Sequence, residues 1–188
     1  MSESTNSLYQ LTIWYQPGQT MRGLAQSGRG HGLALVVAAL FGFVQAIPMF
    51  FAEAGGEAQY FLFGAVFGLV GLYLFGWLLR NFGRWFGGQA AVREVRTSLG
   101  LSLMPWLLLF VVLFWFRQSM GPDALASFYW VFFLGFLYGY TILLLSLAAA
   151  LRLSVLKTFL CLVTTFIVSL FPLTLVLQLM FPQLVPAQ

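Results

Sequence analysis

Long apolar stretches recur along this chain at the length that a lipid bilayer requires. A helix crosses about 30 Å of hydrocarbon with about 20 residues. Stretches of this length, separated by short polar connections, lie at Leu33–Phe51, Tyr60–Leu79, Leu99–Phe116, Phe128–Leu151 and Thr158–Phe181. The pattern predicts an all-α, polytopic integral membrane protein, with one membrane domain over residues 1–188. We expect a bundle of about five transmembrane helices, together with amphipathic interfacial helices.

The polar N-terminal part carries a helical pattern of its own. Ser7 and Gln10 have the spacing of a capping box, and Leu8 and Leu11 then fall on one helical face. Amphipathic segments of this kind lie in the plane of the membrane surface. We expect residues 8–30 to form an interfacial segment, and a frayed cytosolic tail is the alternative.

A second segment of this kind joins the second and third stretches, over residues 81–98. Phe82 and Trp85 are too apolar for a free aqueous loop, and Gly87-Gly88 permits a sharp change of direction. We expect this segment to lie on the membrane surface as well.

The first apolar stretch has a rival interpretation as a cleaved signal peptide. Ala52-Glu53-Ala54 follows it and resembles a signal cleavage site. The apolar run is longer than the hydrophobic region of a typical signal peptide, and it begins only at Leu33. We therefore expect an uncleaved span.

The composition agrees with a lipid environment and excludes a soluble domain. Charged residues make up 7% of the chain and hydrophobic residues 61%, with a mean hydropathy of +0.91. Soluble domains are about one quarter charged. The net charge of +4 does not indicate a nucleic-acid partner, because the basic residues flank the apolar stretches. We expect membrane lipids as partners, together with other membrane proteins or a second copy of the chain.

The positions of the basic residues orient the predicted bundle. Of the 9 Lys and Arg residues, only Arg117 lies on the side opposite the others. Because Lys and Arg mark the cytoplasmic face, we expect the N-terminus inside and the C-terminus outside. The residues expected at the lipid headgroups of the cytoplasmic interface are Arg22, Arg29, Arg80, Arg84, Arg93 and Arg96.

The chain offers no constellation of catalytic residues. No Asp or Glu lies in the central part of a predicted span, and His31 and Cys161 are each the single residue of their type. One histidine and one cysteine provide neither a metal site nor a disulfide within the chain. We therefore expect no enzymatic activity, no catalytic residue, no metal and no cofactor. A membrane enzyme would require His31 to meet Glu53 or Glu57, which the predicted topology places at opposite leaflets.

Small and neutral polar residues inside the spans indicate packing. Glycines at helical spacing make flat ridges on the second and fourth spans, where another helix can approach closely. These helix-packing positions are Gly64, Gly68, Gly71, Gly135 and Gly139. We expect them to pack within the chain, with a second copy as the alternative. A buried polar pocket is the hypothesis for Gln45, Thr164 and Ser169, of which Gln45 lies three residues before Pro48.

The order of these features resembles the Yip-domain family, the five-span membrane proteins that include Rab/Ypt-interacting members and bacterial relatives. The resemblance rests on a short segment from Pro17 to Leu24 before the first span, on Gly87-Gly88 and Arg93 before a third span with an early Pro105, and on Gly139-Tyr140 in the fourth span. The long acidic and proline-rich cytosolic region of the eukaryotic trafficking members is missing. The resemblance therefore implies a compact bacterial-type member of the inner membrane, with the N-terminus inside, and it implies no enzymatic activity.

Two functional hypotheses follow from the sequence. The first is a non-enzymatic protein that organises the membrane, as a scaffold, a partner subunit or a lipid-interacting factor. The second is a small transporter or lipid scramblase that uses a groove between kinked helices, lined by Gln45, Thr164 and Ser169.

Overall fold

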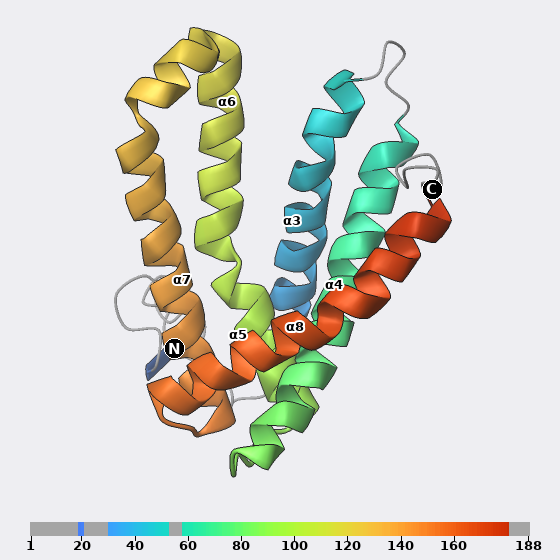
Figure 1. Ribbon diagram of the computed structural model, residues 1–188, viewed down its shortest axis with the longest axis vertical. Coiled ribbons are helices and arrows are strands. Elements are labelled where there is room, and N and C mark those ends of the chain that lie inside the picture. Colours follow the sequence, from blue (N-terminus) through green and yellow to red (C-terminus); the bar gives the residue numbers. More distant parts are fainter. Residues whose placement is uncertain (1–18, 21–29, 53–57, 181–188) are drawn as a thin grey trace, which may run out of the picture.

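Helices occupy the predicted apolar stretches in the computed structural model, which describes residues 19–20, 30–52 and 58–180 (Figure 1). The helices are α3 (His31–Ala52), α4 (Gln59–Trp85), α5 (Val92–Ser102), α6 (Met104–Ser127), α7 (Tyr129–Leu151) and α8 (Val155–Met180). The part of the chain that the structure describes contains no strand. The prediction of an all-α membrane protein is confirmed.

The helices differ in how far they can cross a membrane. α3, α4, the combined α5–α6 segment and α7 are each long and apolar enough to span one. The apolar part of α8, Val155–Phe171, is shorter than these four spans. The predicted interfacial segment 8–30 lies outside the described residues, apart from Gln19, Thr20 and Gly30.

α3 and α4 form a tight antiparallel hairpin because small residues let their backbones touch. A methyl group placed on Gly64 would lie 2.5 Å from the carbonyl oxygen of Gly42 and 2.8 Å from Cβ of Ala46. A methyl group on Gly68 would overlap the carbonyl oxygen of Ala38. Contacts this close leave no space for a side chain, so the glycines fix the separation of the two helices.

Residues 81–98 contain the end of α4 and the start of α5, and their predicted position on the membrane surface stays a prediction. Residues 81–85 continue α4, and α5 packs inside the bundle against α3, α4 and α7. Val95 and Ser102 are fully buried, and the exposed fraction of Ser98 is 1%. The apolar stripe of α5 is therefore buried among other helices.

The turn between α4 and α5 depends on the two predicted glycines. Gly87 has a φ of 92°, a conformation that L side chains rarely adopt. The N–H of Gly88 donates to the carbonyl of Gly83 at 2.8 Å, and the N–H of Gly87 donates to the carbonyl of Arg84 at 3.0 Å. This pair of bonds is the Schellman motif, which ends α4 and turns the chain toward α5.

A break at Leu103 separates α5 from α6. Pro105 follows it in the first turn of α6, where a missing N–H costs little. The N–H of Leu103 bonds to the carbonyl of Gly100, so the last turn of α5 is tightened.

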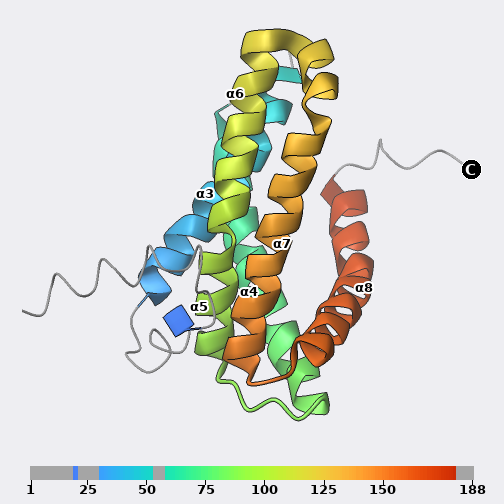
Figure 2. The same cartoon turned by 90° about the vertical axis from the view of Figure 1, so that its left-hand side faces the viewer.

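The remaining helices complete the bundle around α5. α6 and α7 form a second antiparallel pair, and α8 crosses α4 obliquely (Figures 1 and 2). The core lies where α4, α5, α7 and α8 meet. It contains Leu79, Phe82, Val95, Leu99, Leu147, Leu151 and Cys161.

Candidate functional site

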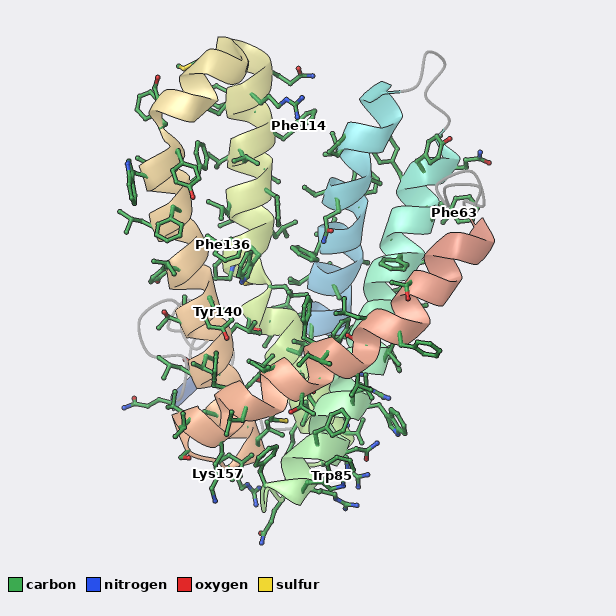
Figure 3. All side chains as sticks on the ribbon, in the orientation of Figure 1. Phe63, Trp85, Phe114, Phe136, Tyr140 and Lys157 are labelled. Atoms are coloured by element: carbon green, nitrogen blue, oxygen red, sulfur yellow. The ribbon has the colours of Figure 1, made fainter. Side chains whose placement is uncertain are left out.

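Positive charge collects at one end of the bundle, which we name the basic end: the end where α4 finishes, α5 begins and α7 gives way to α8. Side chains tipped with nitrogen gather there, near the labelled Trp85 and Lys157 (Figure 3). The basic residues of this end are Arg80, Arg84, Arg93, Arg96, Arg152 and Lys157. Arg117 lies in α6 toward the opposite end.

The acid at the basic end already has a structural role. Glu94 accepts a hydrogen bond from the N–H of Ala91 at 3.0 Å and so caps the start of α5. Its other oxygen lies 3.8 Å from the guanidinium of Arg152, in a pair that is open to solvent. Within the described residues, the remaining acid is Asp123 in α6, far along the helix from this end. Among the described residues, one acid, Glu94, therefore lies beside the six basic residues of this end.

Arg96 has an unusual position for a charged residue. A methyl group on Gly76 of α4 would lie only 2.6 Å from Cγ of Arg96, so its aliphatic stem crosses α4 over the bare glycine backbone. The guanidinium carbon lies 4.1 Å from the centre of the Tyr73 ring, which is cation–π distance. The Nε atom of Arg96 is buried and has no hydrogen-bond partner among the described residues.

Arg80 lies on the same stripe of α4 as these two residues. Tyr73, Gly76 and Arg80 are spaced i, i+3 and i+7, which places them on one helical face. In the described part of the chain, the Nε atom of Arg80 is also buried without a hydrogen-bond partner, and Nη1 donates to Oδ1 of the neighbouring Asn81 at 3.5 Å. The guanidinium groups of Arg80 and Arg96 thus both lie along this face of α4. Each has a buried Nε atom that makes no described hydrogen bond.

His31 joins α3 to α5. Its Nδ1 atom lies 3.4 Å from Oγ1 of Thr97. Glu53 and Glu57, its candidate catalytic partners, are outside the described residues. Within the described part of the chain, no group of three or more His, Cys, Asp and Glu residues is placed to hold a metal ion.

The arrangement can be compared with known proteins. The family model of the Yip1 domain matches residues 11–176, which is most of the chain. The chain belongs to the Yip1 domain family. Neither the curated proteins nor the solved structures gave a match to this Yip1-domain chain.

The predicted glycine ridges of this Yip1-domain protein each face their own hairpin partner. Gly64 and Gly68 lie against α3, whereas Gly71 has open space around it. A methyl group on Gly135 would lie 2.8 Å from the Leu109 side chain of α6, and one on Gly139 would lie 3.0 Å from Nε1 of Trp106. The two ridges therefore do not meet each other.

The three residues of the predicted polar pocket lie in different surroundings. Gln45 is exposed on α3. Thr164 and Ser169 are on α8, and their hydroxyls donate to the carbonyls of Leu160 and Phe166 in the same helix. No described contact joins Gln45 to the other two, and a shared pocket stays a prediction.

Sequence reasoning missed several members of the site. Tyr73 and Gly76 lie in a predicted apolar span, and their helical spacing to Arg80 is the sequence signal that could have identified them. Ser98 of α5 was also not predicted as buried, and its hydroxyl has no partner among the described residues. Of the predicted interface residues, Arg22 and Arg29 lie outside the described residues.

Proposed function

We propose that this Yip1-domain protein is a non-enzymatic, lipid-interacting membrane protein that gathers anionic lipids around its basic end. The observation that carries the proposal is the imbalance of charge at that end. Arginines of α4 and α5 collect there, and the acid beside them, Glu94, is engaged in capping α5.

The expected strength of this attraction is substantial. A Lys or Arg close to an anionic membrane surface contributes about 1 kcal/mol. Arg84 and Arg93, the exposed arginines of α4 and α5, therefore provide about 2 kcal/mol together at low salt. Exposed charges are screened by salt, so the attraction should weaken as ionic strength rises.

The same charges support an orientation. Basic residues are retained on the cytoplasmic side of a membrane, so we place the basic end in the cytoplasmic leaflet of a bacterial inner membrane. The N-terminus is then inside and the C-terminus outside. Recruitment of anionic lipids at that leaflet would let the protein organise its surroundings as a scaffold, with other membrane proteins as further partners.

The direct test compares how two lipids associate with the protein. The full chain is reconstituted in phosphatidylcholine vesicles with trace spin-labelled phosphatidylglycerol or phosphatidylcholine, and the motionally restricted fraction of each is measured. We expect phosphatidylglycerol to be preferred, and the preference to fall toward unity in about 1 M salt, where the screening length is about 3 Å.

Variants locate the effect. Replacing Arg80, Arg84, Arg93 and Arg96 together by Gln should remove the preference, whereas Arg117→Gln at the opposite end should keep it. Equal association of the two lipids with the wild-type protein at low salt would overturn the proposed function.

A further inference from the structure

The strongest unexplained feature of the structure is the direction of the Arg96 side chain. The Cα atom of Arg96 is level with Gly76, since a methyl group there would lie 3.6 Å from it. The guanidinium lies on Tyr73, one helical turn farther from the basic end. The side chain therefore runs away from the aqueous boundary, along α4, instead of toward it.

The length of α4 places this guanidinium in the hydrocarbon. α4 has 27 residues, which makes it about 40 Å long, about 10 Å more than the hydrocarbon thickness. Tyr73 precedes Trp85 by twelve residues, or about 18 Å along the axis. Even if all the surplus length projected at the basic end, Tyr73 would lie inside the hydrocarbon, and any tilt of the helix would increase its depth.

A charge at this depth requires an anion. An uncompensated guanidinium in hydrocarbon is costly, and a cation–π contact supplies only part of the compensation. The nearest charge along the stripe is Arg80, which adds a second positive charge. Of the acids in the described residues, Glu94 is hydrogen-bonded at the start of α5 and Asp123 is on α6 near the other end.

The site is open toward lipid. Tyr73 is 42% exposed and Trp77, on the next turn, is 51% exposed. Farther along α4, Val66 and Val70 are also exposed and apolar. This face can take acyl chains beside the two guanidinium groups, and phosphate is the anion whose oxygens match a guanidinium in bidentate geometry.

We propose that Arg96 forms a site for the phosphate of one anionic phospholipid, with Arg80 as a second basic group on the same face of α4 and with the acyl chains along the exposed part of that face. Gly76 is a positioning residue, because only a bare backbone lets the stem of Arg96 pass. Tyr73 holds the guanidinium from one side and leaves its hydrogen-bonding edge to the phosphate. This site depends on the proposed function in one respect: both require an anionic lipid.

The experiment is native mass spectrometry of the delipidated full chain, titrated with phosphatidylglycerol or phosphatidylcholine. We expect a first phosphatidylglycerol to bind at least tenfold more tightly than later ones, about the effect of one charge-assisted hydrogen bond. Arg96→Gln and Arg80→Gln should each remove this first step. Arg84→Gln, which removes the same charge at an exposed position near the end of α4, should weaken this first step far less than Arg96→Gln does.

A glycine pair on α4 tests the geometry rather than the charge. Gly76→Ala displaces the stem of Arg96 and should weaken the first step about tenfold. Gly71→Ala adds the same methyl group in open space and should have no effect. Far-UV circular dichroism and the detergent-unfolding midpoint show whether each variant is folded. If Arg96→Gln does not fold, Arg96→Lys, which keeps the stem and charge but loses the planar fork, decides in its place.

The outcomes separate the site from the general proposal. If Arg84→Gln weakens the first step as much as Arg96→Gln or its substitute Arg96→Lys, binding is diffuse surface attraction, and the site is overturned while the proposed function stands. An unchanged first step in either Arg96 variant that folds also overturns the site. Inorganic phosphate should not displace the lipid. If inorganic phosphate does displace phosphatidylglycerol, the site binds the free anion, and the lipid site is overturned.

Discussion

The α3–α4 hairpin gives a prediction that depends on one methyl group. Gly64→Ala places that group 2.5 Å from the Gly42 carbonyl oxygen and 2.8 Å from Cβ of Ala46. Favourable contacts between carbon atoms need about 3.5–4.0 Å, so the helices must separate by about 1 Å. A gap of that size forfeits about a quarter to a half of the dispersion energy at the contact, and overpacking costs about 1–3 kcal/mol in total.

Gly71→Ala is the matched control for this change. It lies on the same helix and meets nothing within 4 Å. Both variants gain about 0.8–1 kcal/mol of helix propensity, so this contribution cancels in the comparison. We therefore expect Gly64→Ala to be less stable than Gly71→Ala by about 1–3 kcal/mol.

The assay is unfolding of the full chain in mixed micelles, titrated with a denaturing detergent and followed by far-UV circular dichroism. Gly64→Ala should unfold at a lower detergent fraction than wild type, and Gly71→Ala at the same or a higher one. Equal midpoints for the two variants would refute the close contact between α3 and α4.

Three further predictions follow from other parts of the fold. Gly87→Ala forces a side chain into a positive-φ conformation and should cost about 1–2 kcal/mol in the same unfolding assay, whereas Gly32→Ala, with open space around it, should not. Arg84→Cys should be protected from an impermeable maleimide applied to intact cells and Arg117→Cys should be labelled; the reverse pattern would contradict the proposed orientation. Cys161→Leu enlarges a side chain that is fully buried in the core and should destabilise the protein by about 1–3 kcal/mol, and an unchanged midpoint would show that the site has spare volume.

The sequence predicts the helices of this fold well because bilayer thickness sets their length. Apolar stretches of about 20 residues have few alternatives in lipid. The glycine spacing on α4 likewise indicates a close helix contact, but it does not name the partner. That Gly64 and Gly68 meet Gly42 whereas Gly71 meets nothing depends on where the hairpin bends and how α3 crosses α4.

α5 shows where sequence patterns reach their limit. A short helix with apolar and charged stripes has the same periodicity on a membrane surface as inside a bundle. The difference lies in Thr97 and Ser98, small hydroxyl residues on the faces that α3 and its other neighbours cover. Their burial follows from the positions of the surrounding helices, which local periodicity does not contain.

The candidate site was only partly predictable for a similar reason. The charge pattern identifies Arg80 and Arg96 as residues near headgroups, since basic residues flank the spans. It cannot show that the side chain of Arg96 crosses Gly76 to reach Tyr73, because these residues lie on different helices. That contact turns a general surface charge into a defined position for an anion.

The central claim is that the arginines of the basic end hold the phosphate of an anionic lipid. Solid-state NMR measures this contact directly, by dephasing of ¹⁵N-labelled arginine side chains by the ³¹P of phosphatidylglycerol in reconstituted vesicles. We predict dephasing of guanidinium nitrogens in the wild-type protein and a large reduction of it in the Arg80→Gln/Arg96→Gln double variant. A wild-type protein without arginine dephasing would contradict the claim.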